Sequence, residues 1–436
     1  MEKKIKAAVL TLGCRVNQYE SDFIIKELEK ADVQICPFSE VCDLYVINTC
    51  SVTGESDRKS RQMIRRATKT NPQAKVIVTG CFSQINPEDA GKIPGVSYVC
   101  GNNLKSKIPQ IALELLEKDM PCTVNVPSIY EGGFDTMCVG APLTRTRAFV
   151  KVEDGCDSRC AYCIIPYARG NVRSCPPENV INEVEAIADE GCVEVVLTGI
   201  ETAAYGKDLE NGYTLADLII DVSKIDGIER IRLGSLDPAS ITKSFVDKVK
   251  DVKKLMPHFH ISMQSGNTKT LNAMRRKYNI EMAKANIDYL RQSIDNVMLS
   301  ADVITGFPGE SDEDFEKTLE FFKENRFLHL HMFPYSKRKG TVACEMKEQV
   351  DEGVKRQRLH MLERQQRKTK LQLLLEYMEK NPVIPVLFEV FDGTFAEGHS
   401  PSFVEIRVEN DTSLGGEIHN VKLTHTDGHF IFGELI

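Results

Sequence analysis

Three cysteines between residues 154 and 170 have the spacing of ligands to an iron–sulfur cluster. In the stretch DGCDSRCAYCIIPYARG, Cys156, Cys160 and Cys163 are separated by three and then two residues. Thiolates this close in sequence can each bind one iron of a four-iron cluster. A structural zinc site takes four ligands, and the next cysteine, Cys175, lies twelve residues further on. The spacing therefore predicts a cluster with three protein ligands and one open iron.

This CxxxCxxC spacing resembles the signature of the radical S-adenosylmethionine (SAM) superfamily. In that superfamily the open iron binds the amino and carboxylate groups of SAM. The resemblance implies a 4Fe-4S cluster and SAM as cofactors. The alternative is that these are three buried structural cysteines, but core cysteines do not require this spacing between a strand and a polar loop.

A second set of cysteines lies upstream, each at the end of a strand-like run. The runs AAVLTLGC, DLYVINTC and AKVIVTGC are short and apolar, and they end at Cys14, Cys50 and Cys81. Helical patterns at 20–30 and 56–70 separate the runs, which predicts βαβ units and a parallel sheet. The carboxyl ends of parallel strands meet at one edge. We therefore expect the three thiols to converge and to form a second site that is one ligand short.

Two other cysteines bear on this second site. Cys100 also ends a strand-like run, VSYVCGN, and spacing alone does not exclude it as a ligand. Cys42 precedes its strand and would face the opposite edge of the sheet. Cysteine is often simply buried, so three unrelated residues in strand-end turns remain the alternative interpretation.

Nearly the whole chain resembles the methylthiotransferases of the radical SAM superfamily. The segments TLGCRVNQYESD, VINTCSVT, VTGC and GCDSRCAYCIIPYARG carry the similarity. TLGCRVNQYES is most similar to the branch that modifies threonylcarbamoyladenosine in tRNA, whereas the sister branches carry other residues after that cysteine. The resemblance implies that Cys14, Cys50 and Cys81 hold a second 4Fe-4S cluster and that Cys100 holds none.

The resemblance also implies a reaction and its partners. The reaction is SAM-dependent radical methylthiolation of C2 of N6-threonylcarbamoyladenosine at position 37, next to the anticodon of tRNA. The partners are the tRNA anticodon loop, SAM and an electron donor such as flavodoxin or ferredoxin. Methylthiolation of isopentenyladenosine in tRNA or of a ribosomal protein is the alternative within the same chemistry. A non-catalytic iron–sulfur protein that binds RNA or senses redox state is the alternative from another class.

Six strand-like runs in the middle of the chain must position the first cysteine triplet. They are RAFVKVE, VEVVLTG, ERIRLGS, HFHISMQ, VMLSADVITG and FLHLHMF, and the helical patterns between them lie at 177–190, 215–224, 240–250, 268–276 and 312–325. Such repeats predict a partial (β/α)6 barrel with its site at the carboxyl ends of the strands. No catalytic residue is predicted beyond the cluster ligands. The candidate SAM contacts at the strand ends are Tyr162, Gly199, Glu201, Ser235 and Gln264.

Two of these candidates have a specific chemical purpose. The aromatic face of Tyr162 suits stacking on the adenine of SAM. In the superfamily, the place of Gly199-Ile200-Glu201 carries a Gly-Gly-Glu-like motif that meets the methionine amino group. A carboxylate at Glu201 suits that ammonium group because the two can form a charge-assisted hydrogen bond.

Basic residues gather in two places, which bears on an RNA partner. Between residues 58 and 69 there are six basic residues and no acidic one, and Arg58, Arg61, Arg65 and Lys69 share one helical stripe. Such a stripe is usually a solvated face, but the absence of acids favours phosphate contacts. The second group, with aromatic residues that suit a single-stranded RNA loop, comprises Arg145, Arg147, Arg169, Arg173, Arg275, Arg276, Lys277, Lys337, Arg338, Lys339, Tyr167, Tyr278 and Tyr335.

The end of the chain differs in composition from the rest. Residues 371–436 hold 3 basic and 11 acidic residues, so residues 1–370 hold 55 − 3 = 52 basic and 63 − 11 = 52 acidic ones. The strand and turn pattern predicts a small antiparallel, OB-like β-barrel, and FAEGHSPSFVEIRV resembles a TRAM domain. Its acidity disfavours phosphate binding, so if this domain touches RNA, we expect local contacts from Arg407, Lys422 and aromatic residues such as Phe403.

These patterns predict an α/β protein of several domains. We expect an N-terminal parallel α/β (Rossmann-like) domain with the auxiliary cluster at 1–120, a linker at 121–143, a radical SAM barrel at 144–370 and a TRAM-like β-barrel at 371–436. No stretch approaches the ~18–20 apolar residues of a membrane span, so no membrane partner is expected. Fourteen cysteines without an export signal indicate reduced thiols and a cytoplasmic protein.

Overall fold

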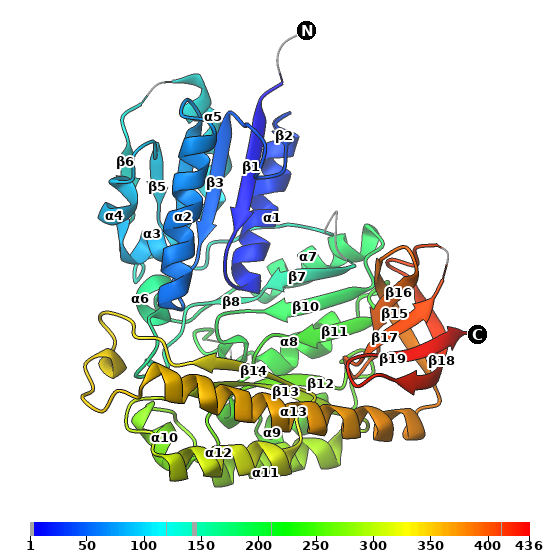
Figure 1. Ribbon diagram of the computed structural model, residues 1–436. Coiled ribbons are helices and arrows are strands. Elements are labelled where there is room, and N and C mark those ends of the chain that lie inside the picture. Colours follow the sequence, from blue (N-terminus) through cyan, green and yellow to red (C-terminus); the bar gives the residue numbers. More distant parts are fainter. Residues whose placement is uncertain (1–3, 119, 142–145, 211, 411) are drawn as a thin grey trace.

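The computed structural model has three parts, which Figure 1 shows as an N-terminal sheet above a central barrel, with a small C-terminal barrel beside it. It describes residues 4–118, 120–141, 146–210, 212–410 and 412–436. The expected domain boundary at 143–144 lies outside the described residues.

The N-terminal part is a six-stranded parallel sheet with the order β2-β1-β3-β4-β5-β6. Its strands are β1 (Lys6–Thr11), β2 (Gln34–Ile35), β3 (Leu44–Thr49), β4 (Lys75–Gly80), β5 (Tyr98–Cys100) and β6 (Thr123–Asn125). Its helices are α1 (Arg15–Lys30), α2 (Gly54–Thr70), α3 (Cys81–Ile85), α4 (Pro87–Gly91), η1 (Asn102–Lys107) and α5 (Ile108–Glu117). Every residue of β3 is buried, as expected for a central parallel strand covered on both faces. The predicted parallel α/β fold is confirmed.

The segment expected to be only a linker also contributes to this sheet. Residues 123–125 form β6, where Val124 pairs with Val99 and Asn125 pairs with Cys100. This pairing covers the backbone of β5, which would otherwise be an open sheet edge. Further along the segment, Met137 and Val139 pack against Tyr19 of α1. The segment therefore ties the sheet to the barrel.

The central part is the predicted partial barrel of six parallel strands. Its strands are β7 (Arg147–Lys151), β10 (Glu194–Thr198), β11 (Arg230–Leu233), β12 (His258–Gln264), β13 (Met298–Thr305) and β14 (His329–Pro334). Two three-stranded sheets are joined between β11 and β12 by the bridges Ile231–Leu255 and Leu236–Ile261. The covering helices are α7 (Pro177–Asp189), α8 (Leu215–Val222), α9 (Lys243–Val249), α10 (Thr268–Ala273), α11 (Ile280–Ser293) and α12 (Asp312–Asn325).

Helix α11 was not among the predicted helices. Its apolar residues Ile280, Ala283, Ile287 and Leu290 repeat at intervals of three and four, and the last three are buried. The side chain of Asn279 caps its first turn by accepting the N–H of Met282 at 2.9 Å. Both signals are present in the sequence, so α11 could have been predicted from it.

The C-terminal strands form a closed five-stranded barrel with the order β15-β16-β17-β19-β18. They are β15 (Val383–Phe391), β16 (Phe395–His399), β17 (Glu405–Glu409), β18 (Ile418–Thr426) and β19 (Ile431–Leu435). All pairs are antiparallel except β17 with β19, which is parallel. The long helix α13 (Glu352–Lys380) leads into this barrel and crosses the boundary expected at 370. In the described ranges, no helix is both long and apolar enough to cross a membrane.

A loop of the C-terminal barrel packs against the amino ends of strands in the central barrel. The Phe403 ring stacks on His258 and His399, with centroid distances of 4.7 and 4.3 Å. The guanidinium groups of Arg147 and Arg232 lie 5.3 and 4.8 Å from the centre of the same ring. These contacts inside the molecule occupy the ring, so the RNA contact expected for Phe403 is wrong.

Helix α1 meets the barrel helix α7 at a buried carboxyl group whose protonation responds to pH. The Tyr19 hydroxyl donates to Glu183 at 3.0 Å, and the N–H of Val139 donates to the same carboxylate at 2.8 Å. Burial nevertheless raises the pKa of Glu183 to about 7. The folded state therefore holds this proton at pH values where the unfolded chain has already released it.

We expect the protein to lose stability as the pH rises through this range, by about 3 kcal/mol at most. The contribution of Glu183 is fully present below the usual glutamate pKa and disappears as the pH passes about 7. Glu183→Gln should remove this dependence. Thermal unfolding midpoints of both proteins at about pH 5.5 and about pH 8 test it. Equal pH dependence in the two proteins would contradict the assignment.

Candidate active site

The three upstream cysteines lie together at the carboxyl edge of the N-terminal sheet. Cys14 caps α1, Cys50 follows β3, and Cys81 begins α3 directly after β4. Gly13 and Gly80 precede two of them with φ of 102° and 98°. A Cβ at Gly13 would lie 2.8 Å from the Cys50 sulfur, and one at Gly80 would lie 2.3 Å from the Thr49 carbonyl oxygen. Glycine is required at both positions because a side chain there would clash with the residues at the end of β3.

The charges of these thiols also show that they are neighbours. Burial raises the pKa of Cys50 to about 11, with further contributions from Cys81 and Cys14. Burial raises the pKa of Cys14 as well, and Cys81 adds to it. Three mutually repelling thiolates need positive charge between them, which cluster irons would supply.

Among the described residues, no group of three His, Cys, Asp or Glu side chains that could hold a single metal ion is found. The thiolates of a cubane cluster each bind a different iron. Cys100 behaves differently, because its thiol points to the Leu104 carbonyl oxygen at 3.7 Å and burial raises its pKa to about 12.

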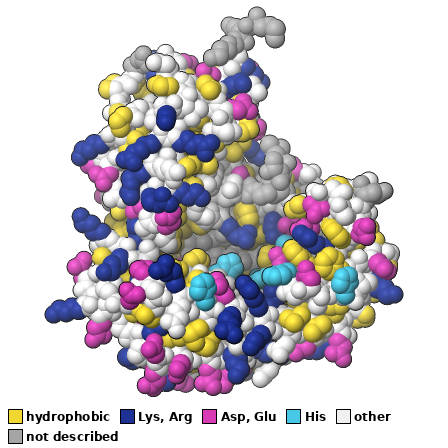
Figure 2. Space-filling model, viewed as in Figure 1, with side chains coloured by type: hydrophobic (Ala, Val, Ile, Leu, Met, Phe, Trp, Pro, Cys, Tyr) yellow, Lys and Arg dark blue, Asp and Glu magenta, His cyan; other side chains and the backbone are white. Residues whose placement is uncertain are grey.

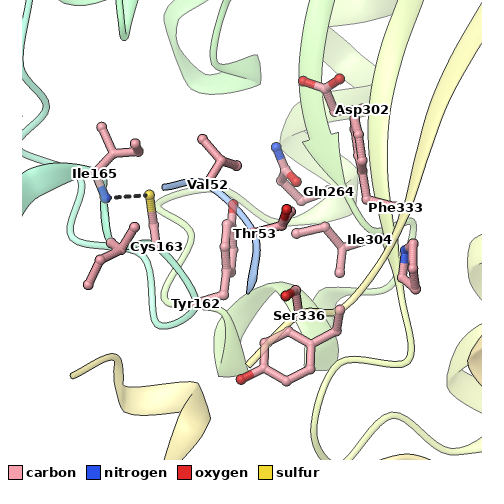
Figure 3. A pocket seen from close by; sticks show the side chains of 13 residues that line it. Val52, Thr53, Tyr162, Cys163, Ile165, Gln264, Asp302, Ile304, Phe333 and Ser336 are labelled. Atoms are coloured by element: carbon pink, nitrogen blue, oxygen red, sulfur yellow. Dashed lines mark hydrogen bonds between the residues drawn. The ribbon is translucent and has the colours of Figure 1, made fainter. Parts of the chain in front are cut away.

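The triplet of Cys156, Cys160 and Cys163 lies on a loop that is closed at its base by a short antiparallel ribbon of β8 (Glu153–Asp154) and β9 (Arg173–Ser174). Each sulfur accepts a hydrogen bond. The Cys156 sulfur accepts the Ser158 N–H at 3.4 Å, and the Cys160 sulfur accepts an N–H of the Arg276 guanidinium at 3.1 Å. The Cys163 sulfur accepts the Ile165 N–H at 3.4 Å, which Figure 3 shows. Hydrogen bonds to cluster sulfurs stabilise their negative charge. The donor set therefore fits a 4Fe-4S cluster.

A cavity of about 290 Å³ lies between the N-terminal sheet and the mouth of the barrel. Figure 3 shows residues from both parts facing each other across it. Val52 and Thr53, which follow Cys50, lie opposite the loop that carries Cys163. The lining residues are Val52, Thr53, Tyr162, Cys163, Ile164, Ile165, Gln264, Asp302, Ile304, Phe333, Pro334, Tyr335 and Ser336.

The two triplets are electrostatically coupled near this cavity. Burial and the neighbouring Cys160 raise the pKa of Cys163 to about 12, and Cys81 of the other triplet contributes in the same direction. The cavity is thus bordered by Cys163 itself and by Val52 and Thr53, which follow Cys50.

Two of the five predicted SAM contacts, Tyr162 and Gln264, line this cavity. The Cys156 thiol donates to the Glu201 carboxylate at 3.0 Å, which places this carboxylate beside the loop that carries Cys156, Cys160 and Cys163. Ser235 follows β11 but is not among the residues that line the cavity.

Gly199 and Glu153 explain how the loop after β10 is held in place. The Glu153 carboxylate accepts the Glu201 N–H at 2.8 Å, and a Cβ at Gly199 would lie 2.5 Å from that carboxylate. Glu153 is fully buried, and burial raises its pKa well above the usual range. No sequence pattern marked Glu153, because its partner lies 48 residues away.

Several basic residues expected at the RNA surface are instead held inside the protein. Arg276 pairs with Asp237 at 2.7 Å in addition to its bond to Cys160. Arg338 donates to Ser51 and Asp57 at 2.9 and 2.7 Å. Arg147, Arg169, Tyr278 and Tyr335 are also buried. The RNA contacts predicted for Arg147, Arg169, Arg276, Arg338 and Tyr278 are therefore wrong, whereas Tyr335 lines the cavity.

The remaining members of that group divide as follows. Arg173 is half-buried and donates to the Ile129 carbonyl oxygen at 3.1 Å. Arg145 lies outside the described residues. The residues of the group that are exposed are Arg275, Lys277, Lys337, Lys339 and Tyr167.

Comparison with known proteins first identifies the class. Residues 150–322 match the Radical SAM superfamily, and residues 6–101 match the Uncharacterized protein family UPF0004. The fold is similar to that of the radical SAM methyltransferase TsrM from Kitasatospora setae, solved with cobalamin and a [4Fe-4S] cluster. The TM-score is 0.58 at 13% identity, over 78% of this chain and 74% of that one. The fold and the site thus define a radical SAM enzyme.

Full-length relatives then identify the family. The chain is 37% identical over 435 residues to threonylcarbamoyladenosine tRNA methylthiotransferase MtaB of Bacillus subtilis (strain 168), covering 97% of this chain and 95% of that protein. It is 32% identical over 443 residues to tRNA-2-methylthio-N(6)-dimethylallyladenosine synthase of Thermoanaerobacter pseudethanolicus, covering 100% and 93%. The chain belongs to the radical SAM methylthiotransferases. Its cofactors are SAM and two 4Fe-4S clusters.

Proposed function

We propose that this enzyme methylthiolates C2 of N6-threonylcarbamoyladenosine at position 37 of tRNA, next to the anticodon. The observation that carries the proposal is one cavity that is lined by Cys163 of the barrel loop and by Val52 and Thr53, which follow Cys50. The target carbon loses a hydrogen atom to a radical formed at one cluster and gains a sulfur group from the other cluster. Both clusters must therefore have access to it. Among the relatives, the MtaB proteins at 37% and 38% identity support this substrate over the dimethylallyladenosine synthases at 32% and 34%.

The proposal assigns a role to each group of residues. Cys156, Cys160 and Cys163 would hold one cluster, and Cys14, Cys50 and Cys81 would hold the other. When bound, SAM and the clusters supply the radical, sulfur and methyl chemistry that acid–base groups cannot perform on an unreactive C–H bond. Tyr162, Gln264 and Glu201 would orient SAM, while Gly199 and Ser235 are weaker candidates for the same task.

Apolar side chains would keep water out of the reaction. Ile164, Ile165, Ile304 and Phe333 line much of the cavity. Exclusion of water protects reactive species from side reactions. The same proposal assigns the auxiliary cluster to residues 1–120, SAM cleavage to 144–370 and a TRAM-like role to 371–436, joined through 121–143.

The partners follow from the same proposal. The tRNA anticodon loop would enter beside α2, whose first turn lies next to the cavity-lining Val52 and Thr53. Lys and Arg side chains gather over α2 in Figure 2. A reductant such as flavodoxin or ferredoxin would supply the electron, and the reaction would take place in the cytoplasm, where tRNA is found.

Helix α2 supplies a testable RNA contact. Arg65 and Lys69 lie on its predicted stripe and are exposed, whereas Arg61 lies on the Phe82 ring at 5.5 Å. Replacing both exposed residues by Gln should weaken tRNA binding and reduce the slope of log K against log salt by about 1 for each lost phosphate contact. Binding titrations at several salt concentrations measure this slope.

A matched control is Lys284→Gln on α11, which removes one exposed lysine outside α2. It should leave the salt slope unchanged. An unchanged slope in the α2 variant as well would show that α2 is only a solvated face.

Reconstitution with defined substrates tests the proposed function. The anaerobic enzyme, with SAM and dithionite, is offered anticodon stem-loop RNAs that carry either threonylcarbamoyladenosine or isopentenyladenosine. We expect the methylthio product from the first RNA and at least about 100-fold less from the second. A preference for isopentenyladenosine would reject the proposed substrate. A lack of SAM cleavage with loaded clusters would favour the non-catalytic sensor.

A further inference from the structure

The barrel wall below the cavity has a polar side-chain cluster that the roles assigned above do not use. In β13, Asp302 pairs in register with His331 of β14, and in β12, His260 pairs with Ser300. Alternate residues of neighbouring strands point to the same face of a sheet. The opposite face of these strands packs into the barrel core through Ile261, Ala301 and Val303.

These three side chains contact one another. His260 Nε2 lies 3.1 Å from a carboxylate oxygen of Asp302, and the rings of His260 and His331 meet edge to face with centroids 5.0 Å apart. Asp302 also lines the cavity that Cys163 borders. His side chains are visible in Figure 2 along the lower edge of the hollow beneath the N-terminal sheet.

A guanidinium group at the start of helix α1 packs on the barrel strand β7. Arg15 begins α1 directly after Cys14, and its guanidinium carbon lies 4.9 Å from the centre of the Phe149 ring on β7. Burial lowers the pKa of His331, with smaller contributions from His260 and Arg15. His331 is therefore neutral near pH 7 and can both donate and accept a hydrogen bond.

The chemistry of this wall matches one class of adenosine substituent. A threonylcarbamoyl group carries a carboxylate, a hydroxyl and urea N–H groups, whereas an isopentenyl group carries only hydrocarbon. Arg15 can pair with a carboxylate, and Asp302 and the histidines can bind hydroxyl and N–H groups. A hydrocarbon placed here would displace water from these polar groups without replacing the lost hydrogen bonds, and a binding site built for hydrogen bonds rejects such a group.

We propose that Asp302, His260 and His331, together with Arg15, bind the amino-acid part of the modified adenosine and select it over an apolar substituent. In this assignment Arg15 binds the carboxylate, and Asp302 with the two histidines binds the hydroxyl and urea groups. The inference rests on the proposed function and adds the residues that read the substrate. All four are specificity residues that contact substrate; none takes part in the chemistry on C2.

The test compares acid and ester substrates in the reconstituted enzyme. Anticodon stem-loop RNAs carry threonylcarbamoyladenosine either as the free carboxylate or as its methyl ester. For Arg15→Gln we expect kcat/KM for the acid to fall by about 100-fold and that for the ester by less than about 3-fold. Arg15→Lys should restore part of the preference. Equal losses on both RNAs would overturn the assignment of Arg15.

Asp302→Asn provides a second test that is independent of the residue next to Cys14. Its substrates are the threonylcarbamoyl RNA and a glycylcarbamoyl RNA, which lacks the hydroxyl group. We expect about a 10-fold loss on the first and little change on the second. Equal effects on both would overturn the assignment of Asp302.

Controls separate this inference from the proposed function. Arg367→Gln and His360→Ala, both exposed on α13, should keep the wild-type ratios. Iron content must equal that of the wild type in every variant that is compared; if Arg15→Gln loses iron, Asp302→Asn alone decides. Failure of the wild type to modify the threonylcarbamoyl RNA rejects the proposed function and this inference with it. A wild type that modifies it, with ratios unchanged in the variants, rejects only the inference.

Discussion

Cys14→Ala should abolish the methylthio product, by at least about 10³-fold, while the enzyme still cleaves SAM. Removing one of three ligands should release the cluster at the edge of the N-terminal sheet, whereas the Cys156 loop belongs to the barrel and keeps its own ligands. Iron should fall from about eight to about four per chain. Iron analysis, SAM cleavage under dithionite and mass spectrometry of the RNA product measure the three quantities.

Cys100→Ala is the matched control for this experiment. Cys100 also ends a strand of the same sheet, but its thiol donates to the Leu104 carbonyl oxygen. This variant should keep about eight irons and its activity. Retention of all the iron in Cys14→Ala, or loss of half of it in Cys100→Ala, would contradict the assignment of the auxiliary site.

Glu20→Ala should be the most destabilising single change among the charged residues, by about 3–5 kcal/mol. Glu20 accepts hydrogen bonds from Arg169 at 2.6 Å and from Lys151 at 3.3 Å, and it also pairs with Lys105. All four side chains are fully buried. Removal of the carboxylate would leave Lys105 without a carboxylate partner and would leave Arg169 and Lys151 to share Asp154.

The electrostatics of this cluster agree with that expectation. Burial alone would raise the pKa of Glu20, but Arg169, Lys105 and Lys151 hold it well below the usual range. The cluster joins α1, which begins at Cys14, to the barrel segment that follows Cys163. Weakening it should therefore also separate the two candidate cluster sites and reduce methylthiolation more than SAM cleavage.

Glu27→Ala on the same helix is the matched control. Glu27 pairs with Lys30 at 2.6 Å, and the lysine side chain is 71% exposed. Loss of this exposed pair should cost less than about 1 kcal/mol. Thermal and urea unfolding of both variants, loaded with iron, measure the difference. A change in Glu20→Ala no larger than that in Glu27→Ala would show that the buried cluster does not hold the two parts together.

Local sequence patterns predicted the elements and the convergence of the upstream cysteines. Short β-branched runs, each ending in Cys, identified β1, β3 and β4, and the common edge of parallel strands then brought their ends together. The same logic placed the Cys156 loop at the mouth of the barrel. These predictions succeeded because each depends on residues that are adjacent in sequence and on one rule of sheet geometry.

Long-range side-chain pairs could not be predicted in the same way. Arg276 lies 116 residues from Cys160, and Arg169 lies 149 residues from Glu20. Nothing in the local sequence distinguishes an arginine that binds a buried sulfur from one that binds RNA. Phe403 was misassigned for the same reason, because its stacking partner His258 lies on another domain. The sequence shows which side chains are charged but not which distant side chains they contact.

The most direct test of the central claim is the tRNA nucleoside composition of a strain that lacks this protein. The account predicts that 2-methylthio-N6-threonylcarbamoyladenosine disappears, that N6-threonylcarbamoyladenosine accumulates, and that the wild-type gene but not its Cys14→Ala form restores the product. Persistence of the methylthio nucleoside, in a strain with no paralogue able to supply it, would contradict the account.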